Sequence, residues 1–253
     1  MACPDCFSGF ERTDAKPAGT ETTVFGVPTY GIIVIIADLF GWQFVNNRLL
    51  ADTYAAAGYR VYVPDFMAGR AAKPWLLETV QTILTPAKTW GGAVVSKPPA
   101  VFWALVGAGS ALWFNWPSAS FPRIGVAGFC WGGKHTVTLT HKETSHLIDA
   151  AFTAHPSFLS LPGDIDNVRK PLAIALGSND NLLSVSQVQE AEKTLLKLGS
   201  QFPEQLKGKT EVKIYDGAGH GFSSRIDRLN EKQVDQAKEC EAQAVNWFDR
   251  LLA

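Results

Sequence analysis

The chain has 253 residues, of which 46% are hydrophobic and 19% are charged. This composition supplies enough apolar side chain for one large core and excludes an intrinsically disordered chain. The net charge is -1, from 23 basic and 24 acidic groups, which argues against nucleic acid or an anionic membrane as a partner. We therefore expect a single domain over residues 1–253 that acts on a small molecule, with residues 1–20 as an N-terminal arm.

The cysteines and the first residues of the chain indicate its compartment. Four cysteines are too few for a disulfide scaffold at this length, which favours a reducing environment. The N-terminus lacks a basic segment followed by an apolar run, so it does not resemble a secretory signal, and we expect a cytoplasmic protein. Cys3 and Cys6 form a C-x-x-C pair, but no second pair accompanies it, so we expect no zinc or redox site there.

Strands and helices are predicted to alternate along the chain. Residues 31–37 form a continuous β-branched run, which is typical of a strand covered on both faces. Residues 44–58 carry apolar side chains three and four apart and end at Gly58, which predicts a helix. Further apolar runs predict strands at 59–63, 123–128, 148–154, 171–176 and 211–215.

Two more helices complete the pattern. Residues 186–198 have one apolar face, a possible capping box from Ser186 and Gln189, and Gly199 just beyond the end. Residues 234–252 predict a long closing helix. The alternation predicts an α/β fold in which helices cover both faces of a mostly parallel sheet, and ligands bind beyond the carboxyl ends of its strands.

Residues 98–122 contain no charge over 25 residues, which is near the length of a membrane span. Prolines at both ends, with glycine, serine and asparagine inside, favour a buried or lid-like helix instead. We interpret about 66–122 as a lid or pocket segment, with the alternative that its tryptophans pack helices onto the sheet. These tryptophans are Trp75, Trp90, Trp103, Trp113 and Trp116.

A nucleophile elbow is predicted where the strand at 123–128 ends. Residues 128–133 have the G-x-nucleophile-x-G form, with Cys130 in the place of the usual serine. So sharp a turn needs glycines two residues to either side, because side chains there would collide. The turn directs the backbone N–H of Trp131 and the start of a helix toward the sulfur, which lowers the pKa of a thiol. A buried structural cysteine is the alternative.

A thiol nucleophile requires a base and a group that orients the base. Asp180 follows the strand at 171–176, and His220 follows the strand at 211–215. The order Cys130, Asp180, His220 is the order of nucleophile, acid and histidine in α/β-hydrolases, with one helix between acid and histidine. Each motif is weak alone, but together they point to acyl transfer.

Three segments also resemble a known family. They are the elbow with cysteine, residues 217–222 (Gly-Ala-Gly-His-Gly-Phe) and residues 37–41 (Ala-Asp-Leu-Phe-Gly). Together they are similar to the dienelactone hydrolases, cysteine α/β-hydrolases, from about Val24 to the C-terminal helix, and residues 3–6 resemble the fungal branch. The resemblance implies an α/β-hydrolase fold and a carboxylic ester hydrolase, an esterase or lactonase, that works through an acyl-thiol intermediate without a metal or organic cofactor.

The resemblance also assigns roles to single residues. It implies that Cys130 is the nucleophile, His220 the base and Asp180 its orienting acid. It further implies that the backbone N–H groups of Leu39 and Trp131 form the oxyanion hole.

Asp38 stands where the family places an acid, normally glutamate, that interacts with the resting thiol and exchanges with an arginine after the histidine. Asp38 is one methylene shorter than glutamate. Arg225 lies five residues beyond His220, as in eukaryotic members, whereas the bacterial pattern has four. The resemblance therefore implies that Asp38 and Arg225 modulate the thiol, and binding of a substrate carboxylate by Arg225 is a second hypothesis.

Other titratable residues receive structural interpretations. Asp164 and Asp166 precede a strand and are expected to be solvated loop acids. His141 and His146 flank a charged stretch and are expected at the surface. His155 follows the strand at 148–154, so it either faces the site or is a satisfied structural histidine.

Two other functions remain open on these residues. The same site could catalyse a lactonising, cyclising or acyl-transfer step if water were excluded from the acyl-enzyme. A pseudo-hydrolase could use the pocket only for binding. We expect a small-molecule lactone or ester as the partner and a monomer or weak homodimer.

Overall fold

The computed structural model describes residues 30–72 and 122–253. Strands in these ranges form one sheet in the order β2-β1-β3-β4-β5-β6, and every neighbouring pair is parallel. The strands are β1 (Ile32–Ile36), β2 (Arg60–Tyr62), β3 (Ile124–Phe129), β4 (Ala150–Ala154), β5 (Leu172–Gly177) and β6 (Thr210–Tyr215). The predicted parallel sheet is confirmed, and each of the predicted strands is present to within two residues.

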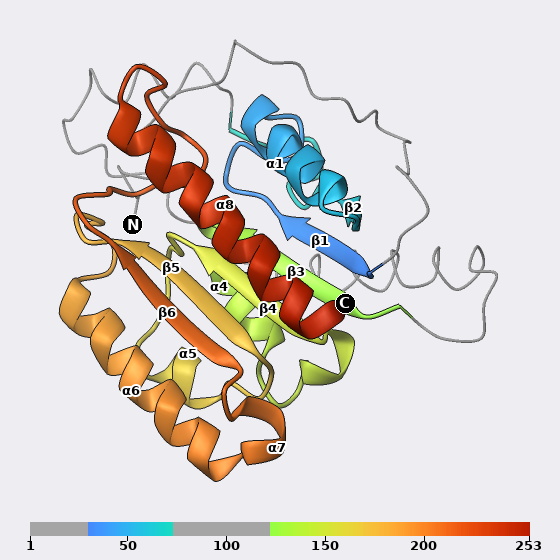
Figure 1. The fold of residues 1–253 in the computed structure, drawn as a ribbon, viewed down its shortest axis with the longest axis vertical. Coiled ribbons are helices and arrows are strands. Elements are labelled where there is room, and N and C mark those ends of the chain that lie inside the picture. Colours follow the sequence, from blue (N-terminus) through green and yellow to red (C-terminus); the bar gives the residue numbers. More distant parts are fainter. Residues whose placement is uncertain (1–29, 73–121) are drawn as a thin grey trace.

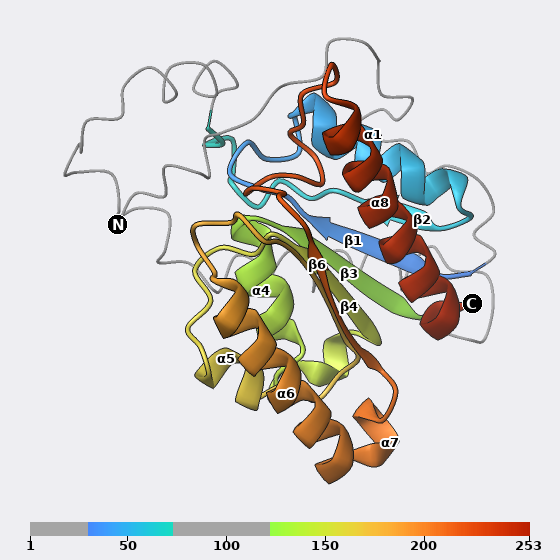
Figure 2. The ribbon, with the colours of Figure 1, turned by 60° about the vertical axis from the view of Figure 1, so that its left-hand side comes forward.

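Helices cover both faces of the sheet (Figures 1 and 2). One face carries α1 (Val45–Ala56) and α8 (Glu231–Leu252), and the other carries α4 (Trp131–Leu139) and α6 (Val185–Gln201). Two short helices, α5 (Gly163–Asp166) and α7 (Pro203–Leu206), lie next to α6. This arrangement explains why the central strands are apolar without polar alternation, since both of their faces are buried.

The two cores follow the two-residue period of the strands. Ile33 and Ile35 of β1 belong to the same core as Tyr54 of α1 and Trp247 of α8, while Ile36 belongs to the core beneath α4 and α6. Successive strand side chains point to opposite faces, so each strand contributes to both cores. Packing against the two cores holds the strands in place, and the loops that follow the strands are positioned with them.

The structure corrects the predicted start and end of α6. The capping box is formed by Ser184 and Gln187, not by Ser186 and Gln189. Ser184 has the extended backbone that an N-cap requires, with φ -71° and ψ 153°. The helix also continues past Gly199 to Gln201, because the glycine is buried there and the residue that cannot continue the helix is Phe202, which precedes a proline.

The expectation that Asp164 is solvated is wrong. Its carboxylate forms an ion pair with Lys134 Nζ at 2.7 Å and also accepts the backbone N–H of Ser160. His141 is half-buried, and its Nε2 contacts the Asp164 carbonyl oxygen at 2.8 Å. Asp166 and His146 are exposed, as predicted. The contacts of Asp164 tie α4 to the loop after β4, which could not be inferred from a local sequence pattern.

Several predictions lie outside the described residues. The N-terminal arm, the Cys3 and Cys6 pair, and most of the proposed lid or pocket segment (its residues 73–121) belong to this group. Within 30–72 and 122–253, no helix has the length and apolar character needed to cross a bilayer. In the same ranges, no group of three or more histidine, cysteine or acidic side chains is arranged to hold a metal ion.

Candidate active site

The site lies at the carboxyl ends of β1 and β3, where the chain leaves the sheet in opposite directions. The connection after β1 leads to α1 on one face, and the connection after β3 leads directly to α4 on the other. Such a switch point leaves a crevice in which open α/β sheets bind ligands. Cys130 follows β3 and Asp38 follows β1, so both stand at this crevice.

Cys130 occupies the predicted strained turn. Its φ of 53° and ψ of -115° lie outside the regions that most residues with a side chain adopt. A Cβ at Gly132 would collide with the carbonyl oxygen of Ile36, and a Cβ at Gly128 would collide with the Thr136 hydroxyl. The two glycines therefore allow the start of α4 to approach β1 and β3 closely, which places the buried thiol at the carboxyl end of β3.

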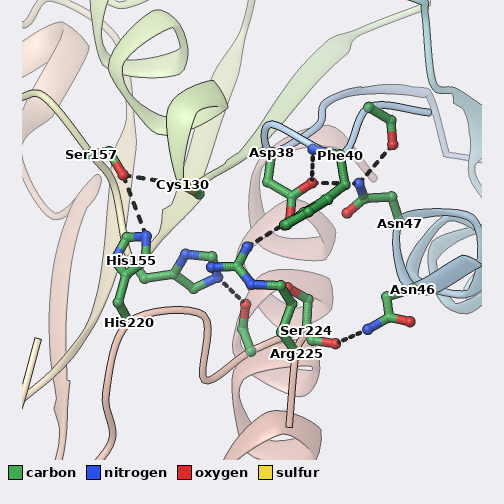
Figure 3. Close-up of polar contacts among 12 residues, drawn as sticks. Asp38, Phe40, Asn46, Asn47, Cys130, His155, Ser157, His220, Ser224 and Arg225 are labelled. Atoms are coloured by element: carbon green, nitrogen blue, oxygen red, sulfur yellow. Dashed lines mark hydrogen bonds and ion pairs between the residues drawn. The ribbon is translucent and has the colours of Figure 1, made fainter. Parts of the chain in front are cut away.

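The three predicted triad residues come together from three separate loops. His220 Nδ1 lies 2.9 Å from Asp180 Oδ2, and both side chains are almost fully buried. On the other side of the imidazole, His220 Nε2 lies 3.3 Å from Ser157 Oγ, which in turn lies 3.3 Å from Cys130 Sγ. Figure 3 shows the Ser157 hydroxyl between the sulfur and the histidine ring.

Ser157 was not among the predicted site residues. It belongs to the loop that follows β4, and its backbone N–H donates to the Cys130 carbonyl oxygen at 2.8 Å. The available signal was its position, because β4 ends at the same sheet edge as β3 and β5. A serine three residues past a buried strand is, however, too common a pattern to be assigned a role from sequence alone.

Asp38 and Arg225 form a buried ion pair. Arg225 Nη1 donates to Asp38 Oδ2 at 2.6 Å, and neither side chain has exposed surface. Asp38 Oδ1 accepts the backbone N–H of Phe40 at 3.1 Å and the side-chain amide of Asn47 at 2.9 Å. The shorter aspartate and the five-residue spacing after His220 are thus compatible with a direct contact (Figure 3).

The charges around the sulfur favour a thiolate. Burial raises the pKa of Cys130, but the positive charges of His220 and Arg225 outweigh it, so the pKa lies below its ordinary value despite the opposing charge of Asp38. Burial lowers the pKa of His220, but the Cys130 thiolate and the hydrogen bond to Asp180 raise it to about 9. Both shifts favour the thiolate and imidazolium form of the pair.

His155 lies beside the triad without joining it. It is fully buried, its Nε2 lies 2.9 Å from Ser223 Oγ, and its ring centroid is 5.0 Å from that of His220. Burial, followed by the charges of His220 and Arg225, lowers the pKa of His155 well below its ordinary value. His155 is therefore neutral and adds no charge that would repel the His220 imidazolium.

Two backbone segments adjoin at the elbow. Trp131 is the first residue of α4, so its N–H has no acceptor within the helix. The close approach of Gly132 to the Ile36 carbonyl brings the loop that contains Leu39 next to this helix start. The two donors assigned to an oxyanion hole thus belong to adjoining segments, and the positive N-terminal end of α4 begins there.

Comparison with known proteins identifies relatives over most of the chain. The model described as "Dienelactone hydrolase family" matches residues 21–252. The protein named hydrolase pyvD from Aspergillus violaceofuscus is 29% identical over 231 residues, which cover 88% of this chain and 82% of that protein. A carboxymethylenebutenolidase homolog from Rattus norvegicus is 27% identical and covers 99% of this chain and 97% of its own length.

The fold is shared with solved structures. The crystal structure described as a putative dienelactone hydrolase from Klebsiella pneumoniae matches with a TM-score of 0.60 at 20% identity, over 93% of this chain and 90% of that chain. The described sheet and its helices therefore have the α/β-hydrolase fold.

Proposed function

This chain belongs to the dienelactone hydrolase family and is a hydrolase, and we propose that it opens lactones or carboxylic esters through a Cys130, His220, Asp180 triad. The observation that carries the proposal is the buried chain of contacts from Cys130 Sγ to Asp180 Oδ2, which begins at a strained elbow. Strain in a buried turn persists where the surrounding structure enforces it, and it is concentrated at active sites.

The proposed reaction has two acyl-transfer steps. The Cys130 thiolate attacks the substrate carbonyl carbon, and the N–H groups of Leu39 and Trp131 stabilise the oxyanion. The ring C–O bond then breaks, and the His220 imidazolium gives its proton to the leaving oxygen. In the second step, neutral His220 takes a proton from water, which attacks the thioester and releases the carboxylic acid and the thiolate.

Asp38 and Arg225 are proposed to set the reactivity of the thiol. The charge of Arg225 lowers the pKa of Cys130, and the charge of Asp38 raises it. Because both side chains are paired with each other, a substrate carboxylate would have to reach a guanidinium that has no exposed surface. This arrangement supports the modulating role over direct substrate binding.

Access to the sulfur requires movement. Cys130 and Asp38 have no exposed surface, and the side chain of His220 is only 1% exposed. A substrate carbonyl can reach Sγ only after neighbouring groups shift. The closed site keeps its dipoles and charges in a medium of low dielectric, where they act more strongly than in water.

The test compares hydrolysis of a dienelactone by the wild type, Cys130→Ala and His220→Ala. Cys240→Ala is the matched control, because Cys240 is also a buried free cysteine but burial raises its pKa. We expect loss of lactone opening in the first two variants and wild-type rates in the control. Retained opening in Cys130→Ala would remove the thiol mechanism.

The product identifies the second step. With substrate opened in ¹⁸O-labelled water, one labelled oxygen in the released acid is expected from hydrolysis of the acyl-thiol. An unlabelled cyclised or transferred product would establish the acyl-transfer alternative. Binding of the lactone without any turnover would establish a pseudo-hydrolase.

A further inference from the structure

We propose that Ser157 relays the proton between Cys130 Sγ and His220 Nε2, so that the functional unit is a chain of four side chains. The inference rests on the proposed triad and concerns how its proton moves. The Ser157 hydroxyl lies 3.3 Å from the sulfur and 3.3 Å from the imidazole nitrogen, and the residue is fully buried.

A hydroxyl is suited to this position because it donates one hydrogen bond and accepts others at the same time. When the pair is neutral, the thiol S–H donates to Ser157 Oγ, and the serine O–H donates to His220 Nε2. When the pair is charged, the imidazolium N–H donates to Ser157 Oγ, and the serine O–H donates to the thiolate. Both protonation states are therefore fully hydrogen-bonded.

The two states interconvert by moving two protons one step each. The S–H bond breaks while a new O–H bond forms on Ser157, and the original serine O–H bond breaks while an N–H bond forms on His220. The serine ends as a neutral hydroxyl, and the net change is one proton from sulfur to nitrogen. No other reactant is required.

The backbone holds Ser157 in this place. Its N–H donates to the Cys130 carbonyl at 2.8 Å, so the serine is tied to the residue whose side chain it contacts. Two nearby non-glycine residues have left-handed backbones, with φ 39° at His155 and φ 61° at Phe158. Such conformations cost free energy and persist where the surroundings enforce them, and here they flank the hydroxyl.

Cys130 and His220 also interact with each other directly, and the other charged groups near the sulfur have partners of their own. Arg225 and Asp38 are paired with each other, and Asp180 contacts the far nitrogen of His220. His155 is neutral and its Nε2 contacts Ser223. These groups set the charge around the thiol, whereas Ser157 contacts both atoms that exchange the proton.

The test uses Ser157→Ala, with Ser157→Thr to restore a hydroxyl. The matched control is Thr140→Val, which removes another buried hydroxyl, one that donates to Val137 at 2.6 Å at the opposite end of α4. Thiolate formation is followed by ultraviolet absorbance against pH, with each variant compared to the same variant carrying Cys130→Ala. This readout requires no reagent to enter the buried site.

We expect Ser157→Ala to raise the midpoint of thiolate formation and to lower kcat/KM for lactone opening by about 10- to 100-fold, the effect of losing a hydrogen bond to a charged group. Ser157→Thr should recover part of both, and Thr140→Val should change neither. A midpoint unchanged in Ser157→Ala would overturn the relay, even if activity fell. If Ser157→Ala does not fold, Ser157→Cys is measured in the same way, because a thiol is only a weak donor and acceptor. An unchanged midpoint of thiolate formation in that variant would also overturn the relay.

Failure of the proposed function gives a different result. In that case, Cys130→Ala and His220→Ala would keep lactone opening, while the Ser157 variants would still report on the thiolate midpoint. If those two variants are inactive and Ser157→Ala is unaffected in both readouts, only the relay is refuted.

Discussion

Replacing Asp38 with asparagine is expected to lower the stability of the protein and yet make the Cys130 thiol more acidic. Asparagine has the same shape and keeps an oxygen for the contacts with Phe40 and Asn47. It removes the charge that Arg225 Nη1 contacts at 2.6 Å, in a pair with no exposed surface. The variant thus leaves a buried guanidinium without its counter-charge.

The magnitude follows from this burial. Removing one member of a buried ion pair lowers the free energy of unfolding by about 3–5 kcal/mol. For a domain of this size, each kcal/mol lowers Tm by about 2–4 °C, so the expected shift is roughly 6–20 °C. Removing both charges, in Asp38→Asn with Arg225→Gln, should cost less than the sum of the single changes, because neither charge is left unpaired.

The pKa of the Cys130 thiol is expected to fall in the same variant. The negative charge of Asp38 raises the pKa of Cys130, and the charge of Arg225 lowers it. Asp38→Asn removes the first of these two effects and keeps the second, so the thiolate should form at a lower pH than in the wild type.

Urea unfolding measures the stability, and thiolate absorbance against pH measures the titration, with Asp38→Glu as the control that keeps the charge. A destabilisation under about 1 kcal/mol, or costs that add in the double variant, would refute the buried pair. A midpoint that rises in Asp38→Asn would refute the electrostatic account of the thiol.

Three further outcomes are expected. Gly132→Ala should destabilise the protein severely or prevent folding, because its Cβ meets backbone, whereas Gly163→Ala, which has open space, should shift Tm little. Lys134→Met should cost about 1–3 kcal/mol in urea unfolding by leaving a largely buried carboxylate unpaired, and the exposed Lys193→Met less than about 0.5. The rate of lactone opening should fall as pH rises through about 9, because His220 then loses the proton that it gives to the leaving oxygen, whereas thiolate absorbance should persist. A rate that stays constant up to about pH 11 would contradict the role of His220 as the acid.

Much of the fold could be predicted because its signals are local. The β-branched run at 31–37 is too apolar for a strand with an exposed face, and the structure buries every residue of β1. The elbow is also local, since its strained turn and the two required glycines lie within five consecutive residues. The order of Cys130, Asp180 and His220 followed from the strand ends, because carboxyl ends of parallel strands share one sheet edge.

The predictions that failed depended on neighbours in space. The local sequence predicts that Asp164 is a solvated loop acid, whereas in the structure its carboxylate contacts Lys134. The capping box of α6 was placed two residues late, since Ser184 and Ser186 both precede a glutamine by three and only backbone conformation distinguishes them.

The sequence by itself determined the alternation of strands and helices and the sharp turn at Cys130, because each depends on steric preferences over a few residues. Only the tertiary structure decided that Ser157 stands between Cys130 and His220, and that Arg225 reaches an aspartate 187 positions away. A hydrogen bond or an ion pair depends on distances of about 3 Å between side chains. Those distances are set by how the strand ends converge, which no local pattern records.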